Sequence, residues 1–261
     1  MFPFALSILS QNSFSMASID DFVGYIELHD VISIQNSFKN GLDPNSQFRG
    51  EPLIFELTSE YTRSPRFTAC VKAFVEAGLM LEDSLLPIIL QDDALGLAQM
   101  LQNDPNLLHK KYTLRCAYTP LFEASLLHLC AEYNLVSCAQ MLIQAGLSVD
   151  TPAGLDEQGL GGQTPIYHTV NQNGHQSKVV FELLLDAGAN LQHQVKGLIW
   201  GQGYPWETFI PAVNPISYTM MGLLPQMHRD EETIAEVVRI LMKAAYGVDG
   251  VVRNVPNVYL R

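Results

Sequence analysis

The chain has 261 residues, of which 48% are hydrophobic and 16% are charged, so it is long enough to bury a large core. Its 27 acidic and 15 basic residues give a formal net charge of -12, which repels a phosphate backbone and argues against a nucleic-acid partner. No run of about 18 apolar residues occurs, so we expect no membrane-spanning helix and no membrane partner.

Two features of the sequence bear on the compartment of the protein. Residues 1–18, MFPFALSILSQNSFSMAS, include an apolar run, but no Lys or Arg precedes it as in a secretory signal. We expect this segment to be an extension outside the folded array, with disorder as one interpretation and a true start at Met16 as another. The four cysteines form no Cys-x-x-Cys pair, and reduced, buried thiols in a cytoplasmic protein are the simplest interpretation. We therefore predict a cytoplasmic location.

A unit of helix, tight turn, helix and stop glycine is clearest in residues 125–150, SLLHLCAEYNLVSCAQMLIQAGLSVD. Apolar residues begin a short helix at Leu126, and the pattern restarts at Val136 with the spacing of one helical face. Gly146 then stands where a helix needs a left-handed C-terminal cap. About six units fill residues 19–247, before a tail at 248–261; the others end at or span residues 37–45, 51–79, 84–106, 164–191 and 214–247.

Short motifs recur at matching places in these units. SLLHLCA (125–131) has Leu-His-Leu and a final Ala, TPIYHTV (164–170) begins with Thr-Pro, and the units end in EAGL, QAGL or DAGAN. These residues resemble the ankyrin repeat, with its Thr-Pro-Leu-His-x-Ala signature and period of about 33 residues. The resemblance implies an all-α, ankyrin-type solenoid of stacked helix-turn-helix repeats with long finger loops. It also implies a structural hydrogen-bonding role for His128.

Three connectors between the units collect kinking prolines and glycines, and we name them the first finger (110–124), the second finger (151–163) and the third finger (192–213). Insertions also occur within two units, SEYTRSP (59–65) in the second and LLPQMHRDEET (223–233) in the last. In the ankyrin-like interpretation the fingers project from one edge of a groove. Loops held by a rigid scaffold and insertions on one face of a repeat array often bind partners.

The third finger holds both tryptophans of the chain, Trp200 and Trp206, with Tyr204 between them. Trp and Tyr are enriched among the residues that dominate binding energy at interfaces, so we predict that these three residues bind a partner. The alternative is that they fold down over the last repeat and seal its core, since a Trp can bury on the order of 150–250 Å². One tryptophan for each task is a further interpretation.

The first finger carries a basic and aromatic cluster that includes Lys111, Arg115 and Tyr118. We predict that these residues contact an acidic patch on a partner. The alternative is a solvated loop in an acidic protein.

The sequence contains no convincing catalytic, metal or cofactor motif. His168 and His175 have no Cys, Asp or Glu at ligand spacing beside them. GLGGQT (159–164) and GQGYPW (201–206) lack the Lys and Ser/Thr of a P-loop, so we interpret them as turns. We therefore predict no enzyme activity, no catalytic residues, no metal site and no cofactor.

The predicted function is a non-catalytic protein–protein interaction module that binds a protein on a concave, finger-loop face. The chain would act as an adaptor or as a stoichiometric inhibitor, and its acidic charge makes a basic protein one candidate partner. A host-interaction role is a third interpretation. The alternative from another class is a small-molecule binder or enzyme with its site under the third finger. The sequence leaves the oligomeric state open.

Overall fold

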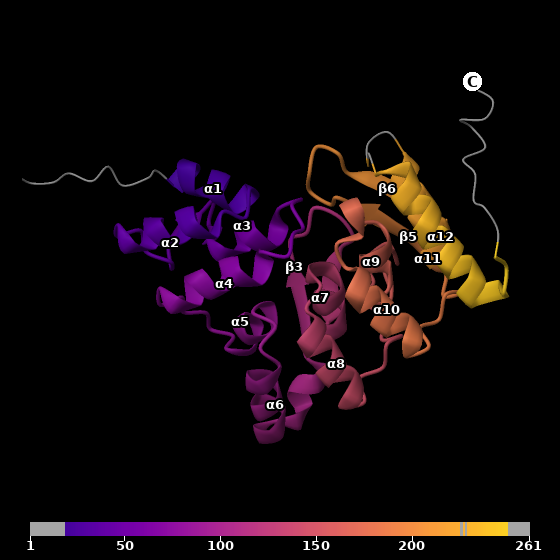
Figure 1. Cartoon of the computed structure of the whole chain (residues 1–261), viewed down its shortest axis with the longest axis horizontal. Coiled ribbons are helices and arrows are strands. Elements are labelled where there is room, and N and C mark those ends of the chain that lie inside the picture. The colour runs from indigo at the N-terminus through magenta and orange to yellow at the C-terminus, as the bar shows by residue number, and fades with distance from the viewer. Residues whose placement is uncertain (1–18, 225–226, 228, 250–261) are drawn as a thin grey trace, which may run out of the picture.

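The computed structural model describes residues 19–224, 227 and 229–249, and the predicted extension at 1–18, the tail beyond 249 and part of the 223–233 insertion lie outside the described residues. Within them, twelve α-helices form six pairs that succeed one another along the long axis of the molecule (Figure 1). The pairs are α1 (Ile19–Glu27) with α2 (Val31–Lys39), α3 (Ile54–Ser59) with α4 (Phe67–Glu76), α5 (Leu85–Leu90) with α6 (Ala94–Asn103), α7 (Leu126–Tyr133) with α8 (Val136–Gln144), α9 (Tyr167–Val170) with α10 (Lys178–Asp186), and α11 (Pro215–Met220) with α12 (Glu231–Tyr246). The six pairs coincide with the six predicted units.

The helices pack in two rows. Helix α7 packs against α5 and α9, while its partner α8 packs against α6 and α10. Every residue of α7 is buried, because this helix has neighbours on both sides and β4 beside it. Helix α12 belongs to the last pair and buries a single face, formed by Ile234, Val237, Val238 and Leu241. No helix in the described ranges is both long and apolar enough to cross a bilayer.

The structure corrects the all-α prediction, because three antiparallel two-stranded sheets occur in the described residues. The sheets pair β1 (Gln47–Phe48) with β2 (Glu51–Pro52), β3 (Lys111–Leu114) with β4 (Leu121–Ser125), and β5 (Val195–Trp200) with β6 (Thr208–Val213). Short 3-10 turns lie at Pro105–His109, Asn173–His175 and Met221–Leu223. The first and third fingers therefore contain hairpins. The pairing of their strands gives hydrogen-bond partners to buried backbone N–H and C=O groups that lie outside the helices.

The predicted stop glycines take the left-handed conformation. Five second helices are followed by a glycine with φ between 68° and 100°: Gly41, Gly78, Gly146, Gly188 and Gly247. Such a φ favours glycine because it has no Cβ. The third pair differs, because α6 ends at Asn103 and is followed by Asp104, whose backbone is extended and leads into a 3-10 turn.

Turn residues of one pair cap a helix of the next pair. The Asp92 carboxylate accepts hydrogen bonds from the backbone N–H groups of Ser137 at 3.0 Å and Cys138 at 2.8 Å, at the start of α8. One pair later, the side-chain oxygen of Asn134 accepts from the N–H of Val180 at 3.3 Å, at the start of α10. Each cap therefore fixes the position of one helix pair relative to the next.

We expect Asp92→Ala to lower the free energy of unfolding by about 1 kcal/mol, because two N–H groups of α8 lose their acceptor. Urea denaturation of wild type and variant measures the difference. The control is Glu82→Ala, which removes an exposed acid from the turn before α5. Equal midpoints for the two variants would contradict the capping role.

Candidate functional site

The tips of two fingers and the insertion of the second pair meet on one side of the molecule. The Tyr204 hydroxyl donates to the carbonyl O of Ser59 at 2.7 Å, and these residues are 145 positions apart. The indole N–H of Trp206 donates to the carbonyl O of Ala117 at 3.2 Å. In Figure 1 the orange loop between β5 and β6 correspondingly reaches back toward the purple segment after α3. We call residues 59–63, 116–118 and 200–206 the finger clasp.

The finger clasp differs from the predicted arrangement, in which the fingers project from one edge. Its backbone takes part directly, since the N–H of Gly201 donates to the carbonyl O of Tyr118 at 2.9 Å. In a regular repeat array each unit contacts only its neighbours. The clasp adds a direct connection between the second pair and the hairpin that precedes the last pair.

The three aromatic residues of the third finger have different environments. Trp200 is 3% exposed and stacks on Tyr118 with 6.0 Å between ring centroids. Tyr204 and Trp206 stack on each other at 4.7 Å and are half-buried. A Cβ at Gly201, whose φ is 63°, would lie 2.5 Å from the Trp206 ring, so this turn requires glycine. Trp200 is therefore buried between the first and third fingers, and partner binding by the three residues stays a prediction.

The predicted cluster of the first finger is not brought together. Lys111 is exposed at the start of β3. Arg115 forms ion pairs with Glu56 and, at 3.5 Å, with Glu51, so its charge is compensated within the chain. Tyr118 is buried in the finger clasp, where a solvated loop residue would be exposed. Partner binding by Lys111 stays a prediction. Arg115 is ion-paired and Tyr118 is buried, so each exposes less of its side chain to a partner.

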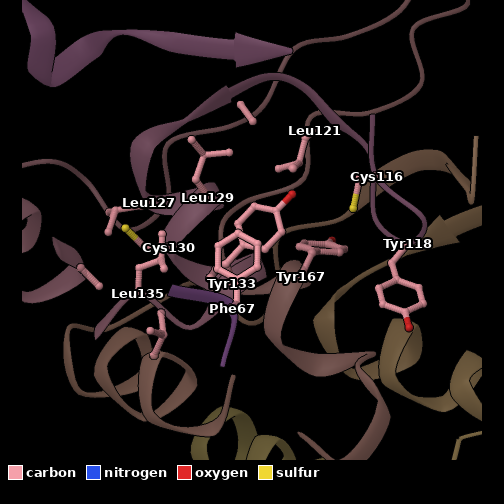
Figure 2. Close-up of a cluster of buried hydrophobic side chains, with 14 of the residues drawn as sticks. Phe67, Cys116, Tyr118, Leu121, Leu127, Leu129, Cys130, Tyr133, Leu135 and Tyr167 are labelled. Atoms are coloured by element: carbon pink, nitrogen blue, oxygen red, sulfur yellow. The ribbon is translucent and has the colours of Figure 1, made fainter. Parts of the chain in front are cut away.

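A buried ionic network extends from Arg63 of the finger clasp to α7 and α9. The Arg63 guanidinium is 2.8 Å from the Glu132 carboxylate, whose other oxygen is 2.8 Å from Nδ1 of His168. The Arg63 side chain lies 5.0 Å from the ring centroids of both Tyr118 and Tyr133. Figure 2 shows buried aromatic and apolar side chains that lie beside this network, with Tyr133 stacked on Phe67 and with Cys116 near Tyr118. The network joins the 59–65 insertion to α7 and α9, and sequence reasoning missed it.

The charged groups of this network are paired with one another inside the protein. Burial opposes ionisation of Glu132, but Arg63 and the hydrogen bond to His168 hold its pKa below the ordinary value. The Arg63 guanidinium also donates to the carbonyls of Glu60 and Thr62 and to Cys116, so its N–H groups are occupied. Burial raises the pKa of Cys116, which keeps the thiol protonated and a poor nucleophile. All four cysteines are free and buried, as predicted.

His128 has the hydrogen bonds of the predicted structural role. Its Nδ1 accepts from the N–H of Ser125 at 3.0 Å, and its Nε2 is 2.9 Å from the carbonyl O of Gln163, to which it donates. Burial and the neighbouring His168 lower the pKa of His128 to about 3. Burial likewise lowers the pKa values of His29 and His175 to about 4. These imidazoles are therefore neutral in the folded protein near pH 7.

Mild acid should weaken the fold before most carboxylates titrate. An unfolded histidine binds a proton near pH 6.5, whereas folded His29, His128 and His175 stay neutral until about pH 3 to 4. Between pH 7 and pH 5 the unfolded state therefore binds more protons, so the free energy of unfolding falls as the pH falls. We expect a lower urea midpoint at about pH 5 than at about pH 7.5, and a smaller difference in His128→Gln. An unchanged midpoint would contradict the buried, neutral state of these histidines.

The second finger connects the two hairpins on their outer side. The N–H of Gly154 donates to the carbonyl O of Phe122 in β4 at 2.9 Å, and the N–H of Gly161 donates to the carbonyl O of Gly197 in β5 at 2.9 Å. Within the finger, Leu155 and Gly161 form an antiparallel bridge. The turn of this finger lies at residues 157–158, and the GLGGQT motif after it contains the bridge at Gly161, so the interpretation of the whole motif as a turn was only partly correct. The second finger joins the first and third fingers into one surface.

Apolar side chains lie on this surface where glycines leave room for them. A Cβ at Gly154 would lie 2.8 Å from the Phe122 ring, and a Cβ at Gly197 would lie 2.7 Å from the Phe209 ring. Leu155 is 60% exposed and Phe209 is 54% exposed. We call this surface the finger platform, and its side chains are Phe122, Leu155, Leu160, Ile199 and Phe209.

The charge around the finger platform is mostly negative. Glu123, Glu157 and Glu207 are exposed in the same segments, and within the part of the chain that the structure describes they form no salt bridge. Lys196 is exposed in β5 and lines a groove of about 330 Å³ beside Leu155. In the described ranges no group of three or more His, Cys, Asp and Glu side chains is arranged to hold a metal ion.

The fold and this surface define a stack of helix pairs whose connectors form a β surface with exposed apolar side chains. No protein-family model matches the sequence, and no curated protein is similar to it. Among solved structures, the human ASB11 ankyrin repeat domain is similar, with 15% sequence identity and a TM-score of 0.33, covering 87% of this chain and 97% of that chain. A likeness this distant carries no conclusion about partner or activity.

Proposed function

We propose that this chain is a non-catalytic, ankyrin-type solenoid that binds a protein partner on its finger-bearing face, as an adaptor or a stoichiometric inhibitor. The observation that carries the proposal is the finger platform, where exposed Leu155 and Phe209 lie on a surface held by hydrogen bonds between fingers. Contiguous exposed apolar side chains rimmed by polar residues mark interaction surfaces. The binding surface is thus the outer side of the fingers rather than the tryptophan Trp200.

A basic partner in the cytoplasm is part of this proposal. The net charge of -12 and the exposed carboxylates of Glu123, Glu157 and Glu207 favour approach of a positive surface. Association should therefore slow as the salt concentration rises, since salt screens exposed charges. A complex whose association rate does not respond to salt would argue against the basic partner while leaving the platform itself in place.

A double variant, Leu155→Ser with Phe209→Ser, tests the finger platform. Affinity capture compares it with wild type and with Leu95→Ser, a control on α6 at a site that is 85% exposed. We expect one protein to bind wild type and the control in a defined stoichiometry and to be lost from the platform variant. Retention of the partner by a folded platform variant would contradict the proposed surface.

The space under the third finger does not favour the small-molecule alternative. Tyr118 and Trp200 are buried there and stack on each other, and the Arg63 guanidinium lies over the Tyr118 ring. A ligand placed under Trp200 would have to displace these packed side chains.

A further inference from the structure

One cleft of the finger platform has the size and lining for a single side chain. It has a volume of about 120 Å³, somewhat smaller than the cavity of about 150 Å³ that holds benzene in an engineered protein. Because this cleft is open on one side, a phenyl-sized ring can enter without full enclosure. The walls are mostly apolar, and its lining includes Pro120, Phe122, Leu160, Leu198 and Ile199.

Gln163 also lines the cleft and leaves a hydrogen-bond acceptor without a donor. Its Nε2 donates to the carbonyl O of Pro120 at 2.6 Å, and because a carbonyl only accepts, this bond fixes the orientation of the amide. The residue is 1% exposed, and in the described residues its Oε1 has no hydrogen-bond partner. Buried acceptors are normally paired, so a ligand with a donor satisfies this site better than a purely apolar one.

The charge beside the cleft is negative. Asp156 is the charged residue in its lining. Glu123 lies beside Gly154, another lining residue, since a Cβ at Gly154 would lie 2.7 Å from the Glu123 Cβ. A cation attached to the ring that enters the cleft would therefore be favoured.

We propose that this cleft binds a tyrosine side chain from a basic segment of the protein partner. The phenol O–H donates to Oε1 of Gln163, and a neighbouring cationic group lies near Asp156 and Glu123. This inference rests on the proposed function and narrows the chemistry of the partner. It can be tested on the chain alone, without the partner.

The probe is tyramine, which joins a phenol to an ammonium group, and the readout is the NMR shift of the methyl groups of Leu160, Leu198 and Ile199. Phenethylamine lacks only the hydroxyl, and 4-ethylphenol lacks only the charge. We expect tyramine to shift these methyl signals saturably, and both analogues to bind roughly three- to tenfold more weakly, the range for one hydrogen bond or one partly exposed charge contact.

Two variants place the site. Gln163→Met removes the acceptor at similar length and should abolish the difference between tyramine and phenethylamine. Ile199→Trp places an indole from this half-buried position into the cleft, and it should abolish the shifts that all three probes cause at Leu160 and Leu198. Unchanged methyl signals in α1 and α2 report intact folding. If Gln163→Met unfolds, the comparison of tyramine with phenethylamine on wild type still tests whether the phenol hydroxyl contributes to binding.

Equal affinities for tyramine and phenethylamine, or no saturable shift at these methyl groups, would overturn the inference. Because the probes do not require the partner, that result leaves the finger platform to be judged by capture with the Leu155→Ser and Phe209→Ser variant. Loss of capture without probe binding would mean that the partner uses the platform but not this cleft.

Discussion

Replacing Glu132 by Gln is expected to lower the free energy of unfolding by about 3–5 kcal/mol, because the buried Arg63 guanidinium then lacks its compensating charge. The two side chains are 3% and 0% exposed, so water cannot replace the lost carboxylate. The same change also removes the charge that faces His168 at 2.8 Å. Urea denaturation at neutral pH, with the slope checked for a two-state transition, measures the loss.

The matched control is Glu76→Gln, which removes a carboxylate from an exposed pair with Lys72 on α4. Exposed pairs contribute little, so this variant should change the free energy of unfolding by less than about 1 kcal/mol. The double variant Arg63→Met with Glu132→Leu should be less destabilised than the sum of its single changes, because neither charge is left alone. Similar losses for Glu132→Gln and Glu76→Gln would show that the buried network does not stabilise the fold.

Trp200→Ala is the second change with a large expected effect, also about 3–5 kcal/mol. The indole is buried in β5 and stacks on Tyr118 of the finger clasp, so its removal leaves a cavity between the first and third fingers. Phe209→Ala on the paired strand β6 is the control, since that ring is 54% exposed and most of its surface already faces water.

Denaturant midpoints of the two variants decide between sealing and recognition for Trp200. If Trp200→Ala is no less stable than Phe209→Ala, the ring does not seal the core and remains a candidate for partner binding. The expected outcome has a practical consequence: loss of a partner from a variant lacking Trp200 would report destabilisation rather than a lost contact. Trp206→Ala and the platform variant are therefore the informative changes for recognition.

The helix pairs could be predicted because their signals are local. Val136 restarts the apolar pattern that becomes α8, and Gly146 ends it with φ of 90°. The structural role of His128 was implied by the resemblance to the ankyrin repeat, and its hydrogen bond to Ser125 spans three positions. Helical periodicity and cap chemistry act over a few residues, so they can be read along the chain.

The fingers could be located but not folded from sequence. Prolines and glycines marked the third finger, yet its closure as β5 and β6 depends on pairings such as Ile199 with Phe209, ten positions apart across a loop. The exposed apolar platform was also missed. The prediction of partner binding rested on the tryptophans, whereas nothing in the sequence alone indicates that Leu155 and Phe209 are exposed.

The sequence by itself determined the six helix pairs, the stop glycines of five of them and the absence of a recognisable catalytic motif, because these depend on neighbouring residues. Only the tertiary structure decided that Arg63 meets Glu132 across 69 positions and that Tyr204 meets Ser59 across 145. It also decided that Trp200 is buried while Phe209 is exposed. Such contacts depend on how the stacked pairs bring distant loops together in space, and a pattern of neighbouring residues does not indicate which distant residues will meet.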